Sequence, residues 1–279
     1  MFEKRSIGLA LVLPAALFVA LGFLLPVGLL LAESFRTPAG WSLAYFTTFF
    51  ADPLNQAVFL RTLRLGLTVT AVCLVVGYAA ALAITGLGPA ARGRFVGVLI
   101  LPLMISPVAR TYAWVVILGR TGLLNVLVLK LGLSDEPLRI LFTETAVFLG
   151  LVQLFFPLAV LPLLSALENL PADVVPAARV LGASWLRVFW QIILPLTREG
   201  LVVGGTLVFV GSLTAYITPA MLGGSKVLML ETLLYQRVSV ANDFVSAGVI
   251  SVILIVMSIA TNVLLRRLAA GRRAGGAHA

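Results

Sequence analysis

Residues that carry out covalent chemistry are scarce in this chain of 279 residues. It holds one cysteine, Cys73, inside an apolar run, and one histidine, His278, in the C-terminal stretch GRRAGGAHA. These two residues can build neither an internal disulfide nor a metal centre nor a nucleophilic triad. The chain also has no G-x-x-x-x-G-K-S/T phosphate loop, so we expect no directly bound nucleotide, cofactor or metal. What remains is non-covalent recognition by the residues that interrupt apolar sequence.

Arg110 is the most informative charge, because apolar sequence surrounds it. Counted along a helix from Arg94, it lies about 24 Å farther on, in the outer half of a membrane about 30 Å thick. A charge at that depth is typical of a residue that lines or gates a solute path. The alternatives are an arginine that reaches the outer interface or one that is fixed by a nearby carboxylate.

Four uncharged side chains are further candidates for a solute path: Tyr112, Trp114, Gln153 and Tyr216. Aromatic faces can hold ammonium groups by cation–π attraction. For each one taken singly, interhelical packing or interfacial anchoring is favoured over a role in the path. No acidic residue falls inside any predicted span, so a path for cations in this chain would depend on aromatic rings and carbonyls, or on carboxylates from a partner.

The stretch from Val175 to Pro195 carries charge and has helix signals of its own. We expect a first short helix with Asp173 as its N-cap and Pro176 at the third helical position, where a missing N–H costs little. Its apolar residues recur at helical spacing on one face: Val174, Ala177, Ala178 and Leu181. Gly182 suits the left-handed position that ends a helix.

A second short helix should follow, with Ser184 as its N-cap and Pro195 at its end. Its apolar face is expected to hold Trp185, Val188, Phe189 and Ile192. A hairpin of this size cannot fold alone, so its apolar face must be buried against something. It either lies on its own membrane domain or docks onto a soluble partner, and periodicity does not separate the two.

Composition decides what surrounds this stretch. The chain is 61% hydrophobic and 11% charged, whereas a soluble domain is about 25% charged, so we predict a single all-α integral membrane domain over residues 1–279. The net charge of +9 comes from basic residues that flank apolar runs, which favours membrane orientation over nucleic-acid binding. Six membrane spans are predicted, at about 7–32, 65–91, 95–118, 145–167, 200–222 and 244–265. The loop 168–199 lies between the fourth and fifth spans, and a disordered tail is expected at 268–279.

The distribution of Lys and Arg predicts the orientation. The two termini, the segment around Arg92 and the central loop hold 11 of them together, and the opposite segments hold 8. Basic residues accumulate on the cytoplasmic side, so both termini and the central loop are expected there. The third span, broken by Pro102 and Pro107, is included because this topology requires it.

The central loop resembles that of ABC importer permeases. Their signature reads Glu-Ala-Ala, three residues, Gly, nine residues, Ile, any residue, Leu-Pro. This chain matches it at six of seven positions: Ala177, Ala178, Gly182, Ile192, Leu194 and Pro195. Pro176 stands in place of the glutamate, which removes a capping box and a charge that could pair with a partner.

The resemblance extends over roughly residues 91–267 and is similar to the spermidine/putrescine permease branch, which also includes permeases for other solutes. It rests on RTYAW at 110–114, the Gly122 and Asn125 pair, the stretches 146–168 and 181–200, and PAMLGG at 219–224. It implies an import permease for a polyamine or a similar small polar solute in the bacterial cytoplasmic membrane.

The resemblance also implies a larger assembly. It contains two ATP-binding subunits that carry ATP and Mg²⁺, a second related permease and an external substrate-binding protein. The loop would then be the coupling helix that fits a cleft on the ATP-binding subunit. Its expected contact residues are Pro176, Ala177, Ala178, Arg179, Gly182, Ala183, Ser184 and Arg187. The chain itself is then expected to be no enzyme.

Two other classes stay open on the residues alone. A secondary transporter driven by an ion gradient usually places ionisable groups near the membrane midplane, and this chain offers only Arg110. A non-transporting membrane scaffold would explain an apolar loop that recruits a partner, but not the six matched positions.

Overall fold

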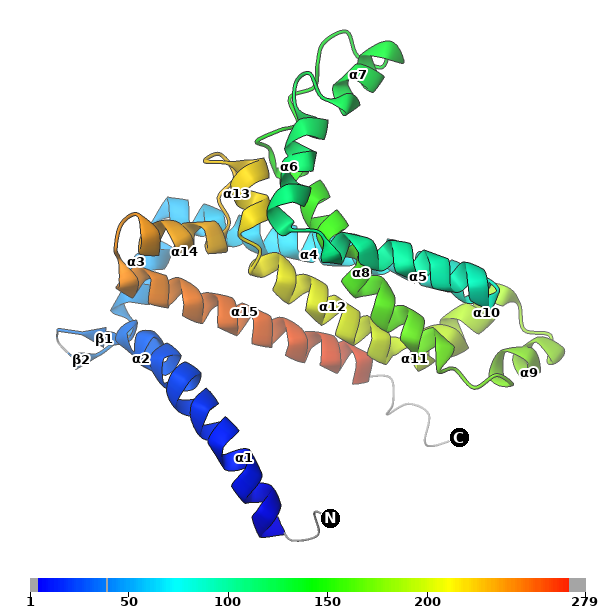
Figure 1. Ribbon diagram of the computed structural model, residues 1–279, viewed down its shortest axis with the longest axis horizontal. Helices are drawn as coiled ribbons and strands as arrows, with labels where there is room; N and C mark the ends of the chain where they lie inside the picture. The colour runs from blue at the N-terminus through cyan, green and yellow to red at the C-terminus, as the bar shows by residue number, and fades with distance from the viewer. Residues whose placement is uncertain (1–4, 39, 271–279) are drawn as a thin grey trace. The chain divides into compact units, whose positions relative to one another are not determined.

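The computed structural model describes the backbone of residues 5–38 and 40–270 and the side chains of residues 12–38 and 40–267. The chain forms two compact units: residues up to 57 with 233–255, and residues 58–232 with those from 256 onward. Apart from one two-stranded hairpin, the regular structure of the described residues is helical. The predicted all-α class is therefore confirmed (Figure 1).

The first unit begins with two apolar helices joined by a π-helical turn. The ring of Pro26 would clash with the carbonyl four residues before it, and the wider turn relieves that clash. A hairpin then pairs Arg36 with Trp41 in antiparallel register. The bounds are α1 (Arg5–Val19), η1 (Ala20–Leu24), α2 (Leu25–Glu33), β1 (Arg36–Thr37), β2 (Gly40–Trp41) and α3 (Ala44–Ala51).

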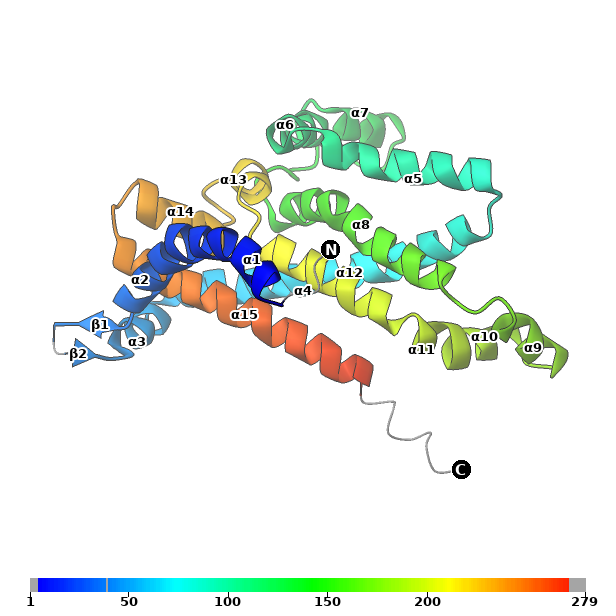
Figure 2. The ribbon, with the colours of Figure 1, turned by 60° about the horizontal axis from the view of Figure 1, so that its bottom comes forward.

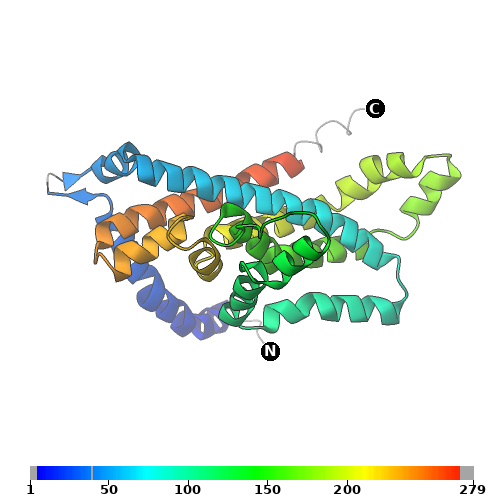
Figure 3. The same ribbon diagram turned by 90° about the horizontal axis from the view of Figure 1, so that it is seen from above.

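The second unit contains the remaining membrane helices, and α4, α14 and α15 contribute residues to both units. Figure 3 shows the chain turning back between α4 and α5. The bounds are α4 (Pro53–Thr85), α5 (Pro89–Met104), α6 (Pro107–Leu118), α7 (Leu123–Lys130), α8 (Glu144–Glu168), α12 (Arg198–Leu213), α13 (Ile217–Gly223), α14 (Leu230–Ser239) and α15 (Phe244–Ala270).

Helix α8 lies at the centre of the second unit, where Leu151 and Leu163 are fully buried. It lies side by side with α12 (Figures 1 and 2). A Cβ atom at Gly200 would lie 2.7 Å from the Cβ of Ala166, so only glycine permits this approach. Small residues at the contact let the two backbones pack closely, as is usual between membrane helices.

Within the described residues, five helical stretches are apolar and long enough to cross a membrane, and a sixth is added if one bent pair counts as a single span. The bent pair is Trp185–Leu196 with Arg198–Leu213. The five others are Val12–Glu33, Pro53–Thr85, Pro107–Lys130, Glu144–Glu168 and Phe244–Arg267. This set agrees with a multi-pass membrane protein of about six spans.

The predicted bounds of the second span differ from those of the helix. Helix α4 begins at Pro53 rather than at residue 65 and ends at Thr85 rather than at 91. The prediction stopped at Arg64 because a charge was read as the edge of the span. A helix of 33 residues is about 50 Å long, so it extends well beyond a hydrocarbon layer of about 30 Å and can carry arginines at its end.

Other bounds also need correction. The predicted third span, 95–118, is two helices that meet at Ile105 and Ser106, and the stretch long enough to cross begins later, at Pro107. The predicted fifth span, 200–222, is likewise divided between α12 and α13. Helix α15 continues to Ala270, so the first part of the predicted tail is helical, while residues 271–279 lie outside the described residues.

Candidate functional site

The central loop consists of two short helices joined by a tight turn at Gly182, as predicted. The elements are α9 (Val174–Val180), α10 (Trp185–Val188), the π-helical turn η2 (Phe189–Ile193) and α11 (Leu194–Leu196). Gly182 has a φ of 81°. The Gly182 amide donates to the Arg179 carbonyl at 3.0 Å, and the Ala183 amide donates to the Ala178 carbonyl at 3.1 Å. This pair of bonds is a Schellman motif, which fixes the direction in which the chain leaves α9.

Only one of the two predicted N-caps forms. The Ser184 hydroxyl accepts from the Arg187 amide at 3.4 Å and caps α10. Asp173 precedes α9 but makes no side-chain capping bond, and its backbone is already helical. An N-cap side chain accepts from the second or third helical amide, and the third residue here is Pro176, which has none. The predicted Asp173 cap is therefore wrong.

The apolar residues of α9 face differently from the prediction. Ala178 is buried and Val175 packs beside it, but Ala177 and Leu181 are exposed. The buried side rests on the ends of α4 and α8, through Ile84 and Leu167 among others. The loop therefore packs on its own membrane domain with one side only.

The second half of the loop is held by Val188 and Ile193, which are buried. The other residues of its predicted apolar face divide: Phe189 is half-buried, whereas Trp185 is exposed. Pro195 does not end this helix, which widens at η2 and continues to Leu196. The wider turn removes the clash between the Pro195 ring and the carbonyl four residues earlier.

Tyr78 of α4 ties the base of the loop to the membrane helices. Its hydroxyl lies 2.5 Å from the Thr197 hydroxyl, and its ring meets Phe189 edge to face at 5.5 Å between centroids. Thr197 is fully buried at the junction of α11 and α12. Where the loop begins, Arg92 of α5 forms an ion pair with Glu168, the last residue of α8. A displacement of the loop would therefore reach α4, α8 and α12 directly.

The tip of the loop presents apolar side chains to the surroundings. Val180 and Leu181 are each 87% exposed, and Figure 2 shows α9 beyond the ends of α8 and α12. Six of the eight predicted contact residues are exposed around them: Pro176, Ala177, Arg179, Gly182, Ser184 and Arg187. Ala178 is buried and Ala183 is half-buried, so these two support the loop from behind.

Arg110 stabilises the break between α5 and α6. It is 8% exposed, and its guanidinium Nη1 donates to the Pro102 carbonyl at 2.8 Å. Helix α5 ends at Met104, so that carbonyl has no partner four residues further along the helix. Among the described residues no carboxylate pairs with Arg110, so its fixation comes from a carbonyl rather than from the acid considered in the sequence.

The other predicted path residues do not converge on one site. Trp114 and Gln153 meet between α6 and α8, where the indole N–H donates to the amide oxygen at 3.3 Å. They line a cavity of about 730 Å³ whose other walls include Phe95, Pro102 and Phe156. Its lining is otherwise apolar, which does not suit a polycation. Tyr112 is exposed elsewhere on α6, and Tyr216 is half-buried just before α13.

The Gly122 and Asn125 pair has a structural role. A Cβ atom at Gly122 would lie 2.3 Å from the Val116 carbonyl. Asn125 is fully buried, and its amide nitrogen donates to the carbonyls of Gly119 and Leu138 while its oxygen accepts from the Leu138 amide at 2.7 Å. These contacts close the turn between α6 and α7.

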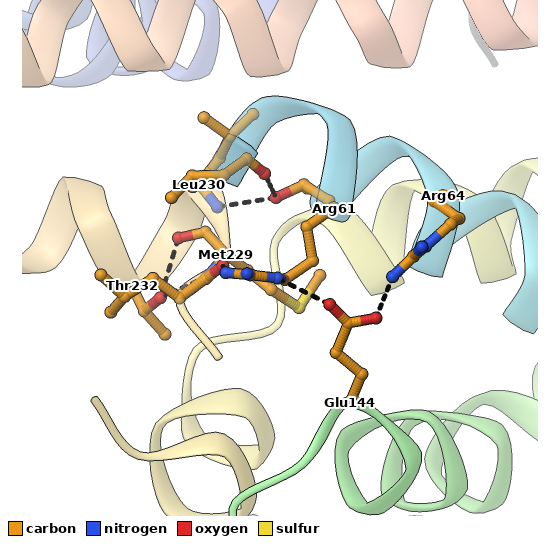
Figure 4. Close-up of polar contacts among 9 residues, drawn as sticks. Arg61, Arg64, Glu144, Met229, Leu230 and Thr232 are labelled. Atoms are coloured by element: carbon orange, nitrogen blue, oxygen red, sulfur yellow. Dashed lines mark hydrogen bonds and ion pairs between the residues drawn. The ribbon is translucent and has the colours of Figure 1, made fainter. Parts of the chain in front are cut away.

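A polar cluster in the N-terminal half of α4, away from the central loop, was not predicted. Figure 4 shows Arg61 and Arg64 directed at Glu144, the first residue of α8. Arg61 Nε lies 2.9 Å from Glu144 Oε1, Arg64 pairs with Oε2, and Arg61 Nη1 donates to the Leu228 carbonyl at 3.1 Å. On the residue that follows Arg61, the Thr62 hydroxyl accepts from the Leu230 amide at 2.9 Å. Together these contacts join α4, α8 and the segment around the start of α14.

Comparison with known proteins agrees with the signature in the loop. Residues 73–273 match the family described as binding-protein-dependent transport system inner membrane component. The spermidine/putrescine transport system permease protein PotB of Haemophilus influenzae is 33% identical over 206 residues, which is 74% of this chain and 72% of that protein. PotB of Escherichia coli is 38% identical over 179 residues. That match covers 64% of this chain and 65% of the Escherichia coli protein, just under two thirds of each.

A solved structure supports the fold. A chain of a bacterial alginate ABC transporter, in complex with an alginate pentasaccharide-bound periplasmic protein, superposes with a TM-score of 0.79. The superposition covers 96% of this chain and 95% of that one at 16% identity. At that identity the likeness shows a shared arrangement of helices.

Proposed function

The chain belongs to the family of binding-protein-dependent transport system inner membrane components, and on that premise we propose that it is the permease subunit of an ATP-driven importer of polyamines. ATP hydrolysis takes place on separate subunits, which carry the ATP and Mg²⁺. The permease provides the membrane path and receives the motion that hydrolysis produces.

One observation carries the proposal beyond family membership. The loop with the six matched positions has a firm base and an exposed apolar tip: Val188 and Ile193 are buried beneath it, and Val180 and Leu181 are exposed at its end. A contact that transmits force needs both a surface to bind and a rigid connection to what must move. The Schellman turn at Gly182 and the Tyr78–Thr197 hydroxyl pair supply that connection.

The contact with the ATP-binding subunit depends on shape and apolar surface. The signature glutamate is replaced by Pro176, so no carboxylate is available at that position. Two aliphatic side chains at the tip, with the exposed Arg179 next to them in sequence, fit an apolar cleft with an acidic rim. The remaining predicted contact residues, Ala177, Gly182 and Ser184, surround them.

The proposed assembly has two ATP-binding subunits, this permease with a second related permease, and a substrate-binding protein on the opposite side. Both termini and the loop face the cytoplasm, as the distribution of basic residues favours. The structure comparison supports the binding-protein partner, since the alginate transporter chain comes from a complex with a periplasmic protein.

The solute is proposed from the named relatives, because the PotB proteins transport spermidine and putrescine by their description. The predicted path residues give this chain little means of holding a polycation by itself, since Arg110 is cationic and the Trp114 cavity is apolar. Binding specificity then resides in the binding protein, and carboxylates along the path come from the companion permease.

The test is reconstitution of the complex with its binding protein in sealed liposomes. Loaded binding protein should stimulate ATP hydrolysis, and labelled spermidine should accumulate only when ATP is supplied. Mass spectrometry of the binding protein, purified from cells, identifies the solute it carries. Uptake that continues without ATP under an ion gradient would overturn the ATP-driven mechanism, and a non-amine solute would overturn the substrate alone.

A further inference from the structure

The segment Trp185–Leu196, which follows the Gly182 turn, has an apolar side that nothing in the described residues covers. Its inward side chains, Val188 and Ile193, are almost fully buried, whereas Trp185, Leu186 and Trp190 are 53%, 67% and 56% exposed. A soluble helix would place polar residues on that side. Two tryptophans and a leucine there need an apolar or interfacial environment.

The geometry of the following bend locates this segment relative to the membrane. It meets the membrane helix α12 at an angle of 66°. At 1.5 Å of rise per residue along its own axis, it advances only about 0.6 Å per residue along the axis of α12. With α12 taken as perpendicular to the membrane plane, the whole segment spans a depth of about 7 Å, and each polar layer of a bilayer is about 5–7 Å thick.

We propose that Trp185–Leu196 is an interfacial anchor that lies in the headgroup layer of the membrane, with Trp185, Leu186 and Trp190 inserted between lipids. The occupant of this surface is the lipid leaflet at the loop end of α12. Continuity with α12 keeps the segment at that depth. Tryptophan prefers this layer because its ring is apolar and its N–H still reaches water.

Charge and backbone agree with this environment. The exposed Arg187 lies between the two tryptophans in sequence and can pair with lipid phosphates, as basic residues do beside interfacial helices. The π-helical turn η2 ends with the Leu194 amide donating to the Phe189 carbonyl. Its wider turn contains Trp190, and the Phe189 ring contacts Trp190 edge to face at 5.3 Å between centroids.

The anchor differs from the tip of α9 in chemistry and in purpose. The tip exposes only aliphatic Val180 and Leu181, and it lies on the other side of the Gly182 turn. The loop would thus have one helix for the soluble partner and one for the membrane. The anchor would keep its position in the headgroup layer, so that a displacement of α9 by the partner rotates the loop about the axis of Trp185–Leu196.

Spin labels on introduced cysteines test the depth. The full chain, assembled with its partner subunits in liposomes, carries Leu186→Cys or Trp190→Cys, with Leu181→Cys as the matched control on the tip. Cys73 is fully buried, and the unaltered chain measures any labelling of it. The label at 186 and at 190 should collide more often with oxygen, which dissolves in lipid, than with a water-soluble nickel chelate. At position 181, once the ATP-binding subunits are removed, the label should collide more often with the nickel chelate than with oxygen.

Two results would overturn the anchor. A nickel collision rate above that of oxygen at both 186 and 190 would place the segment in water. Exclusion of both reagents there would mean that a protein surface, either the companion permease or the ATP-binding subunit, covers it. The measurement requires no solute, ATP or transport, so a failure of the proposed polyamine import would leave its outcome unaffected.

Discussion

The two ends of α4 are held by different kinds of contact. Near its N-terminal end, Arg61 and Arg64 share the carboxylate of Glu144, and Thr62 binds a backbone amide. Near the loop, Tyr78 packs against Phe189 and shares a hydroxyl contact with the buried Thr197. Charged contacts at a partly exposed site can separate and be replaced by water at little cost, whereas buried packing cannot.

The difference indicates which end can open. The loop end is built as a rigid joint, where motion of α9 passes to α4, α8 and α12 together. The end near Glu144 combines one buried bond, from the Leu230 amide to the Thr62 hydroxyl, with ion pairs that can break and form again, and the loop end also has one ion pair, between Arg92 and Glu168. We therefore expect substitutions at the loop end to abolish coupling to ATP hydrolysis. Substitutions at the Glu144 end should shift the equilibrium between closed and open forms of that end.

The largest effect is expected from Gly182→Val. A β-branched residue at a φ of 81° costs about 1–2 kcal/mol or more, so the turn would open and the tip of α9 would point elsewhere. ATP-dependent uptake in liposomes should fall by about tenfold or more, while the subunit still inserts and assembles. Gly182→Asn is the matched control, since asparagine tolerates the left-handed region, and it should retain most uptake. Equal uptake by the valine and asparagine variants would argue against a coupling role for the turn.

A smaller loss is expected from Thr197→Val. This change has nearly the same shape but leaves the buried Tyr78 hydroxyl without its partner, which costs about 1–3 kcal/mol. Thermal unfolding of the purified protein in detergent measures the loss. Thr214→Val is the control, because that hydroxyl bonds only to carbonyls of its own helix and should change stability by less than about 0.5 kcal/mol. A matching loss in both variants would mean that the Tyr78 contact contributes nothing.

A third change addresses the charged end. Glu144→Gln keeps the size of the side chain but removes the charge that Arg61 and Arg64 share. Because Glu144 is partly exposed, the expected cost is about 1 kcal/mol at low salt, and it should shrink in high salt. Arg64→Ala should cost less than Arg61→Ala, because Arg64 is the more exposed and only Arg61 also binds the Leu228 carbonyl. A loss that is independent of salt would show that the contact acts through packing, as at the loop end.

The loop end was the more predictable of the two because its signals are local. The Gly182 turn and the Ser184 cap follow from residues next to each other in sequence, and both formed. Leu181 was placed on the buried face because helical periodicity was continued up to the turn, where the chain already changes direction. The reason why Asp173 does not cap α9 is equally local, because Pro176 has no amide hydrogen for the Asp173 carboxylate to accept.

The Glu144 cluster could not be predicted in this way, because its partners are 80 or more residues apart in sequence. The charges also gave a wrong boundary: the predicted span starts after Arg64, whereas both Arg61 and Arg64 lie within one continuous helix. A pattern of hydropathy locates a helix in lipid but contains no information about which distant carboxylate it meets. The same limit applies to Arg110, whose partner is a backbone carbonyl at a helix break.

The smallest effects concern two carboxyl groups outside the membrane spans. Burial raises the pKa of Glu231, so its charged form is disfavoured in the folded protein. For Asp243, burial acts to raise the pKa, but hydrogen bonds from Ser246 and the charge of Arg237 outweigh it, and the pKa is lowered. A raised pKa means that stability is lost as pH rises through it, and a lowered one means that stability is lost as pH falls through it.

The two carboxyl groups should therefore respond to substitution with opposite sign. At neutral pH, Glu231→Gln should raise the unfolding temperature slightly and Asp243→Asn should lower it, each by less than about 1 kcal/mol in free energy. The gain from Glu231→Gln should vanish once the pH falls below the ordinary range of a glutamate, where both forms are neutral. The loss from Asp243→Asn should persist to lower pH, because Asp243 stays charged longer. A higher unfolding temperature in both variants would mean that burial, and not the contacts of Ser246 and Arg237, governs Asp243, and a lower one in both would contradict the destabilising burial of Glu231.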